Sequence, residues 1–139
     1  MTTVFVDTAY LIARARPDDQ WRDAAVAARN SLGAVSLVTT DEVLTEFLTA
    51  MSRAGPGLRV AAAGTVREIL QAGAIRVVAQ THRSFLDGLG RYEERVDKGY
   101  SLQDCVSMNV MEAEGITEIL TSDRHFEQEG FTVLMKQGR

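Results

Sequence analysis

Four acidic residues stand at separate places in the chain where a fold could bring their carboxylates together: Asp7, Glu46, Asp104 and Asp123. Asp7 comes directly after the apolar run 4–6, and Asp123 ends a second run that begins at residue 119. The carboxyl ends of neighbouring parallel strands share one edge of a sheet, and α/β proteins bind ligands there. Because clustered carboxylates repel one another, such a set requires a cation. A hard divalent metal ion with oxygen ligands meets that requirement.

Three of these residues also have an ordinary structural role open to them. Asp7 suits the N-cap of a helix that begins at Thr8, and Asp123 suits an Asx-turn or another N-cap. Asp104 stands three residues after Ser101, which is the spacing of a capping box, although Asp is shorter than the usual Glu or Gln. Taken alone, Asp104 therefore has the pattern of a cap more than that of a ligand.

Glu46 competes with Asp41 and Glu42 for its place in the set. The spacing Thr39-x-x-Glu42 predicts a capping box, which gives Glu42 a structural role. Glu46 instead lies at the boundary of the apolar stripe of the same predicted helix. From spacing alone, Glu46 is either half-buried for a functional reason or simply at the edge of the polar face.

Other residues that could carry chemistry are few. His82 and His125 are the only histidines and Cys105 is the only cysteine, so a zinc site of the usual ligand type is not expected. Cys105 has the surroundings of a small buried apolar residue. No glycine-rich phosphate loop follows a predicted strand. The acidic quartet is therefore the one candidate centre, and its chemistry requires no histidine as a base.

The elements that would position these residues alternate along the chain. Apolar runs predict strands at residues 4–6, 35–38, 75–78, 119–121 and 132–135, the last at a sheet edge. Caps, breakers and apolar periodicity predict helices at about 8–15, 18–32, 40–51, 58–71, 81–97 and 101–115. This alternation predicts a single domain, residues 1–139, with a three-layer α/β fold and a mainly parallel five-stranded sheet.

Composition limits the class of protein. The chain has 139 residues, of which 45% are apolar and 24% charged, as in one soluble globular domain. No apolar run reaches the roughly 18 residues of a membrane span. No secretion signal opens the chain, and a lone cysteine fits a reducing compartment. We therefore expect a cytoplasmic protein with no membrane partner.

The net charge of −4 is unusual for a protein that binds nucleic acid, because such proteins are usually basic. The acidic quartet supplies four of the negative charges, and a bound metal ion would neutralise most of them. A local basic rim would then suffice to hold a polyanion. Six residues at predicted element ends or loops could supply it, although ordinary surface charge explains any one of them equally well: Arg14, Arg16, Arg53, Arg59, Arg83 and Lys98.

Four short segments resemble, in order, the motifs of the PIN domain. They are residues 4–8 (VFVDT), 43–48 (VLTEFL), 101–105 (SLQDC) and 120–126 (LTSDRHF). Each is weak alone, but four in order at suitable separations are specific, and together they cover nearly the whole chain. The closing stretch 126–134 resembles the VapC-like toxins of type II toxin–antitoxin pairs.

This resemblance implies a five-stranded parallel sheet and a ribonuclease that depends on Mg²⁺ or Mn²⁺. It implies an RNA substrate, a cognate antitoxin and a second copy of the chain as partners. Thr121 matches a hydroxyl position that the family often keeps near the site, and Glu127 is a candidate fifth acidic residue. The resemblance implies catalytic and metal-ligand roles for four residues: Asp7, Glu46, Asp104 and Asp123.

The expected partners need a surface to bind. Five apolar residues lie on helices that carry more apolar surface than one side of a small sheet needs: Trp21, Leu44, Leu48, Met51 and Leu58. We expect a second copy and an antitoxin to cover such helices. An antitoxin arginine placed among the carboxylates would pair with them and displace the metal.

Other functions remain open or are disfavoured by particular residues. The same fold could serve housekeeping RNA processing, or could bind RNA without cleaving it, although an intact acidic set argues against lost activity. Haloacid-dehalogenase-like phosphatases need a second Asp two residues after the first, where this chain has Ala9. A response-regulator receiver needs an Asp after the third strand, where residues 78–80 are Val-Ala-Gln.

Overall fold

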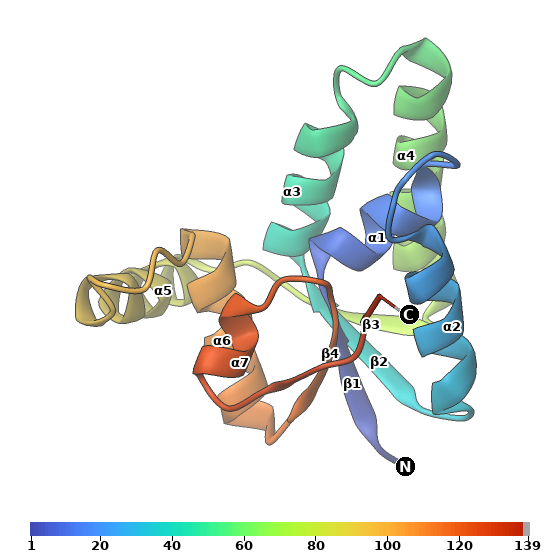
Figure 1. Ribbon diagram of the computed structural model, residues 1–139. Helices are drawn as coiled ribbons and strands as arrows, with labels where there is room; N and C mark the ends of the chain where they lie inside the picture. The colour runs from blue at the N-terminus through green and yellow to red at the C-terminus, as the bar shows by residue number, and fades with distance from the viewer. Residues whose placement is uncertain (138–139) are drawn as a thin grey trace.

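The computed structural model describes residues 1–137, in which strands and helices alternate (Figure 1). The strands are β1 (Thr3–Val6), β2 (Ser36–Thr40), β3 (Ile75–Val78), β4 (Glu118–Leu120) and β5 (Thr132–Val133). They form one all-parallel sheet in the order β3-β2-β1-β4-β5. The predicted five-stranded parallel sheet is confirmed, with the fifth strand at an edge.

Seven helices cover the sheet within residues 1–137. They are α1 (Thr8–Ala15), α2 (Arg22–Leu32), α3 (Asp41–Met51), α4 (Pro56–Ala72), α5 (His82–Glu94), α6 (Leu102–Glu114) and α7 (His125–Gln128). In Figure 1, α2 and α4 lie to the right of the sheet and α6 and α7 to its left, so the sheet is the middle layer. The hairpin of α3 and α4 rises beyond the strands. None of the helices in this part of the chain is long and apolar enough to cross a membrane.

Some helix boundaries differ from the predicted ones. α2 begins at Arg22 and not after a cap at residue 18 or 19, because Asp19 accepts a hydrogen bond from the Trp21 amide (2.8 Å) in a preceding turn. α4 begins earlier than predicted, at Pro56, since proline is favoured at the first helical position. The four-residue helix α7 was not predicted.

The predicted capping box at the start of α3 is wrong. Thr40 is the N-cap, and its hydroxyl accepts a hydrogen bond from the Val43 amide at 3.1 Å. The hydroxyl of Thr39 instead donates to a backbone carbonyl of β1 at 2.7 Å, which ties the two strands together. Glu42 therefore caps nothing, and its carboxylate accepts a hydrogen bond from the Ser84 hydroxyl at 3.2 Å.

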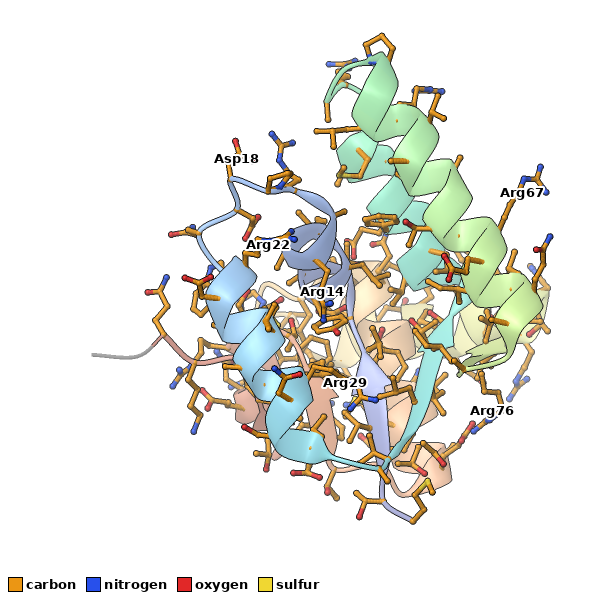
Figure 2. All side chains as sticks on the ribbon, turned by 90° about the vertical axis from the view of Figure 1, so that its right-hand side faces the viewer. Arg14, Asp18, Arg22, Arg29, Arg67 and Arg76 are labelled. Carbon is orange, nitrogen blue, oxygen red and sulfur yellow. The ribbon has the colours of Figure 1, made fainter. Side chains whose placement is uncertain are left out.

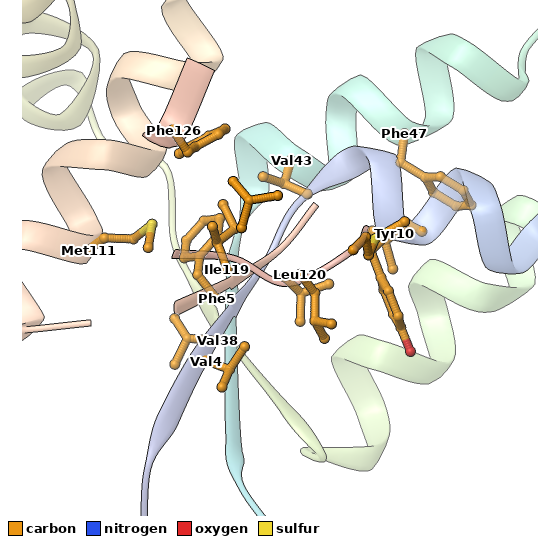
Figure 3. Close-up of a cluster of buried hydrophobic side chains, with 14 of the residues drawn as sticks. Val4, Phe5, Tyr10, Val38, Val43, Phe47, Met111, Ile119, Leu120 and Phe126 are labelled. Atoms are coloured by element: carbon orange, nitrogen blue, oxygen red, sulfur yellow. The ribbon is translucent and has the colours of Figure 1, made fainter. Parts of the chain in front are cut away.

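The hydrophobic core lies on both faces of the central strands (Figure 3). Phe5 and its register partner Ile119 are fully buried toward Met111, on the side of α6. Leu120 lies toward Tyr10, on the side of α1. Burial on both faces explains why the central strands of this parallel sheet are continuous apolar runs and do not alternate with polar residues.

The apolar helix positions predicted to form a partner surface have a different role. Leu44 and Met51 are buried in the core of the chain itself, because α1 and α4 pack on α3. Only Leu48 of the predicted set is exposed. Large exposed apolar side chains gather instead on and just after α5: Phe85, Leu86, Leu89, Tyr92 and Val96. Leu44 and Met51 are thus not available to a partner.

A group of paired charges joins α5 and α6 to the segment after α7. The buried guanidinium of Arg91 pairs with Glu129 at 2.7 Å and with Glu112, and it donates to Asn109 at 2.8 Å. Arg95 also pairs with Glu129, at 3.2 Å. We call these five residues the Arg91 network. Each carboxylate in it faces at least one arginine.

Candidate active site

An open cleft of about 510 Å³ lies at the carboxyl ends of β1 and β4. We call it the acidic cleft, because its lining includes all four carboxylates that the sequence grouped: Asp7, Glu46, Asp104 and Asp123. Thr8, Ser101 and His125 also line it. Among the lining residues of the described chain there is no lysine or arginine. The fold therefore gathers four acidic side chains without a permanent cation.

Strand register places Asp7 beside Thr121. Val6 of β1 pairs with Leu120 of β4, so the residues that follow them are neighbours. The hydroxyl of Thr121 donates to Oδ2 of Asp7 at 2.7 Å. Although Asp7 occupies the N-cap position of α1, its carboxylate makes no capping hydrogen bond to that described helix. The Asp7 side chain is held at the cleft and does not cap α1.

Glu46 reaches the cleft from α3. Its Oε1 accepts a hydrogen bond of 2.5 Å from the Thr8 hydroxyl, at the start of α1. Glu42, one helical turn earlier, does not line the acidic cleft and faces Ser84 of α5. Of the two glutamates that the sequence left in competition, the structure places Glu46 with the other three carboxylates.

Asp104 and Asp123 line the cleft and also make the capping and turn hydrogen bonds that the sequence allowed for them. Ser101 accepts a hydrogen bond from the Asp104 amide at 3.0 Å, and the Ser101 amide donates to Oδ2 of Asp104 at 3.2 Å. Asp123 accepts a hydrogen bond at Oδ1 from the amide of His125 at 2.9 Å, which is an Asx-turn. These bonds fix where both carboxylates lie, so the structural and the site roles do not exclude one another.

Burial of like charges raises the pKa of two carboxyls in the cleft. Burial raises the pKa of Asp7 to about 7, and the Asp104 carboxylate adds to this against the lowering effect of the Thr121 hydrogen bond. Burial likewise raises the pKa of Asp104 to about 6, with a further contribution from the charge of Asp123. The protein alone therefore does not stabilise four negative charges at this place near neutral pH.

His125 lies in the cleft although the sequence argument set both histidines aside. Its Nδ1 is buried and makes no hydrogen bond to any residue that the structure describes. That atom lies 3.4 Å from Oδ1 of Asp123 and 3.8 Å from Oδ2 of Asp104. The one sequence signal was its position two residues after Asp123, which becomes informative only once the short helix α7 is known.

Glu127, the candidate fifth acidic residue, lies away from this group. Its carboxylate pairs with the Arg124 side chain at 2.5 Å, and it does not line the acidic cleft. Thr121, the candidate accessory residue, is fully buried and bonds to Asp7 and to the amide of Asp123 at 3.1 Å.

None of the six residues predicted for a basic rim lines the acidic cleft. Figure 2 shows several arginines on a different face, over α1, α2 and α4. Three of them serve local structure. Arg14 donates to the Tyr10 hydroxyl at 2.9 Å, Arg22 to the Arg14 carbonyl at 2.8 Å, and Arg29 to the Gly33 carbonyl at 3.0 Å.

The residues of the acidic cleft fit a divalent metal ion. The donors are four carboxylates, which hard divalent ions prefer, and one imidazole nitrogen that has no hydrogen-bond partner within residues 1–137. A cation at this place would also favour the ionised forms of Asp7 and Asp104, whose pKa values are raised by burial and, to a smaller extent, by neighbouring carboxylates. Asp104, Asp123 and His125 bring their ligand atoms within 4.8 Å of one another.

Comparison with known proteins gives a family and a fold. The family described as the PIN domain matches residues 4–131. VapC20 of Mycobacterium tuberculosis, described as a sarcin-ricin loop cleaving toxin, is 25% identical, with a TM-score of 0.81 over 96% of this chain and 99% of that chain.

Two further crystal structures, each less than 25% identical to this chain, share its fold. FitAcB of Neisseria gonorrhoeae is 15% identical, with a TM-score of 0.62 over 94% of this chain and 96% of that chain. PAE2754 of Pyrobaculum aerophilum is 22% identical, with a TM-score of 0.55 over 96% of this chain and 90% of that chain. No curated protein matches the sequence.

Proposed function

Because the chain belongs to the PIN-domain family and has a VapC-like fold, we propose that it is an endoribonuclease that hydrolyses RNA phosphodiester bonds with Mg²⁺ or Mn²⁺ in the acidic cleft. The observation that carries this proposal is the gathering of four carboxylates in one cleft that no lysine or arginine of the described chain lines. The carboxylates of the Arg91 network, by contrast, face arginines.

A bound divalent ion would stabilise negative charge on the attacked phosphate and lower the pKa of water. Asp7, Glu46, Asp104 and Asp123 would hold it. Thr121 donates to one oxygen of Asp7, and Thr8 donates to one oxygen of Glu46. These two hydroxyls orient the carboxylates and leave the second oxygen of each to bind the ion or to accept a proton from the attacking water.

A matched pair of glutamates in α3 tests the cleavage activity. Purified protein free of antitoxin is incubated with structured RNAs and Mg²⁺ or Mn²⁺, with and without chelator. Glu46→Gln should lower the cleavage rate by about 100-fold or more, as loss of a positioned catalytic group does. Glu42→Gln, one turn away and outside the cleft, should cleave at the wild-type rate. Cleavage that persists in chelator would contradict the metal requirement.

We also propose that the protein is the toxin of a toxin–antitoxin pair. The likeness to VapC20 over nearly the full length of both chains supports this role. The alternatives are an RNA-processing nuclease and an RNA-binding domain without activity. Expression of the chain alone should arrest growth, co-expression of the adjacent gene should relieve the arrest, and Asp7→Asn should abolish it. A folded, RNA-cleaving protein that causes no arrest would favour RNA processing.

The partners in this proposal are RNA, an antitoxin and a second copy of the chain. Exposed apolar side chains on α5 support a protein partner, because water disfavours such a cluster. Sedimentation analysis should show a dimer for the wild type, and Leu89→Lys should weaken it if α5 forms the interface. A wild-type protein that stays monomeric at high concentration would contradict the dimer.

A further inference from the structure

One buried polar atom in the acidic cleft has no partner. Nδ1 of His125 is screened from solvent and accepts or donates no hydrogen bond within residues 1–137. Leaving such an atom unsatisfied is unfavourable by about 1–3 kcal/mol, so native proteins usually supply a partner, water or an ion. The atom therefore lies where a ligand from outside the chain is expected.

The groups that face this nitrogen are carboxylate oxygens. Oδ1 of Asp123 lies at 3.4 Å and Oδ2 of Asp104 at 3.8 Å. Both separations exceed the 2.7–3.2 Å or so of an ordinary N–H···O hydrogen bond. Two ligands that each lie about 2.1 Å from one ion are about 3.0 Å apart at a right angle and about 4.2 Å apart when opposite. The separations from His125 fall between these limits.

The imidazole is held in place by its surroundings. The backbone amide of His125 donates to the Asp123 carboxylate, and the ring packs edge-on against Tyr100 at 5.4 Å between centroids. Tyr100 is itself buried and donates to Glu129 at 2.9 Å. His82, the other histidine, is exposed on α5 and stacks on Phe85. Only His125 is thus positioned as a ligand.

We propose that Nδ1 of His125 is a metal ligand together with Asp104 and Asp123, and that this nitrogen consequently raises the affinity of the cleft for Mn²⁺ and later first-row divalent ions relative to Mg²⁺. This inference rests on the proposed function and specifies its metal site. Imidazole suits ions such as Fe²⁺, Co²⁺, Ni²⁺ and Zn²⁺, whereas Mg²⁺ selects oxygen ligands. Asp7 and Glu46 supply only oxygen donors, so the two halves of the cleft differ in chemistry.

Direct detection of the nitrogen ligand tests the proposal without any activity measurement. Tag-free, metal-free protein is prepared with ¹⁵N-histidine, loaded with Mn²⁺, and studied by pulsed electron paramagnetic resonance. Because the chain has two histidines, three variants assign the signal. His125→Phe keeps a ring against Tyr100 without a nitrogen, His125→Ala removes the ring, and His82→Ala is the matched control.

A ¹⁵N coupling is expected in the wild type and in His82→Ala, and it should be lost in both His125 variants. Calorimetric titration gives the second readout. His125→Phe should lower the affinity for Co²⁺ by about tenfold or more and change that for Mg²⁺ by less than about threefold. Circular dichroism verifies that each variant is folded.

Two negative outcomes are distinguishable. If Mn²⁺ binds to the wild type with no histidine coupling, or if the coupling persists in both His125 variants, His125 is not a ligand and the proposed nuclease function still stands. If no divalent ion binds to the wild type, both this inference and the proposed metal-dependent function are overturned.

Discussion

The acidic cleft and the Arg91 network are both built on α6, and they differ in whether the chain supplies cations. Burial alone would raise the pKa of Glu129, but hydrogen bonds from Arg95 and Tyr100, with the charges of Arg95 and Arg91, hold it below its usual value. In the cleft, which no arginine or lysine of the described chain lines, burial raises the pKa of Asp7 to about 7. The same chemical group is thus stabilised as an anion in one region and destabilised in the other.

This difference separates a structural use of charge from a functional one. Paired charges in the Arg91 network hold α5, α6 and the segment after α7 together, and they need nothing from outside the chain. No lysine or arginine of the described chain lines the acidic cleft, and we propose that a metal ion supplies the positive charge there. The carboxylates that we propose to be functional are thus distinguished less by their burial than by the absence of a lysine or arginine among the described residues that line the cleft.

The largest expected effect comes from removing the central cation of the Arg91 network. Arg91→Leu removes one of the two arginines that pair with Glu129 and should lower the free energy of unfolding by about 2–3 kcal/mol, as loss of a hydrogen bond to a charged group does. Denaturant unfolding followed by circular dichroism measures this. The double variant Arg91→Leu/Glu129→Leu should recover part of the loss. A single variant as stable as the wild type would mean that the network contributes nothing.

The second prediction concerns pH, because the carboxyls of the two regions change the stability of the protein in opposite directions as the pH rises. In the folded protein, the pKa values of Asp7 and Asp104 are about 7 and 6, whereas in the unfolded chain both are near 3.9. The folded state therefore binds these two protons more tightly. Stability of the metal-free protein should therefore fall as pH rises from about 4 to 7. Glu129, whose pKa is lowered, acts in the opposite sense, and its stabilisation is lost as the pH falls through its folded pKa.

Thermal unfolding at several pH values, with chelator or with excess divalent ion, measures the first of these trends. Added metal should abolish the loss of stability between about pH 4 and 7. A metal-free protein that becomes more stable over this range would contradict the assignment of Asp7 and Asp104 as uncompensated carboxyls.

The third prediction removes one crowded charge. Asp7→Asn should raise the stability of the metal-free protein at pH 8 by about 1 kcal/mol, because it removes repulsion while keeping an acceptor for Thr121. The variant should also lose stabilisation by metal. Differential scanning calorimetry with and without Mn²⁺ gives both quantities. If Asp7→Asn and Asp104→Asn both unfold the metal-free protein, these residues are structural.

The smallest effect is expected at Glu42, which belongs to neither region. Glu42→Gln keeps an acceptor for the Ser84 hydroxyl and should change the free energy of unfolding by less than about 1 kcal/mol. The same denaturation experiment detects this. A larger loss would show that a charge at Glu42, and not only its hydrogen bond, supports the contact between α3 and α5.

Local sequence patterns predicted much of this fold because strands and caps are short-range features. Asp7 and Asp123 could be placed at strand ends from the apolar runs before them, and the Ser101–Asp104 capping box was predicted and is confirmed. The choice between Glu42 and Glu46 could not be made, because it depends on how α3 is rotated against α1. That rotation is set by packing between elements, which spacing does not contain.

Features that depend on contact between distant elements were missed. At Gly88 an added Cβ would lie 2.6 Å from Cγ2 of Val106, so α5 and α6 approach closely at this glycine. The Arg91 network and the position of His125 likewise involve side chains from different elements. No periodicity within one helix predicts them.

The contact between Asp7 and Thr121 also determines when, during synthesis, the acidic cleft can form. The two residues are 114 positions apart, and the cleft needs both. At about 5–20 residues per second, a ribosome takes on the order of ten seconds to proceed from β1 to β4. A nascent chain therefore carries its first carboxylate long before the strand that completes the cleft. For a protein that we propose cleaves RNA, this order of synthesis delays activity until β4 has been translated.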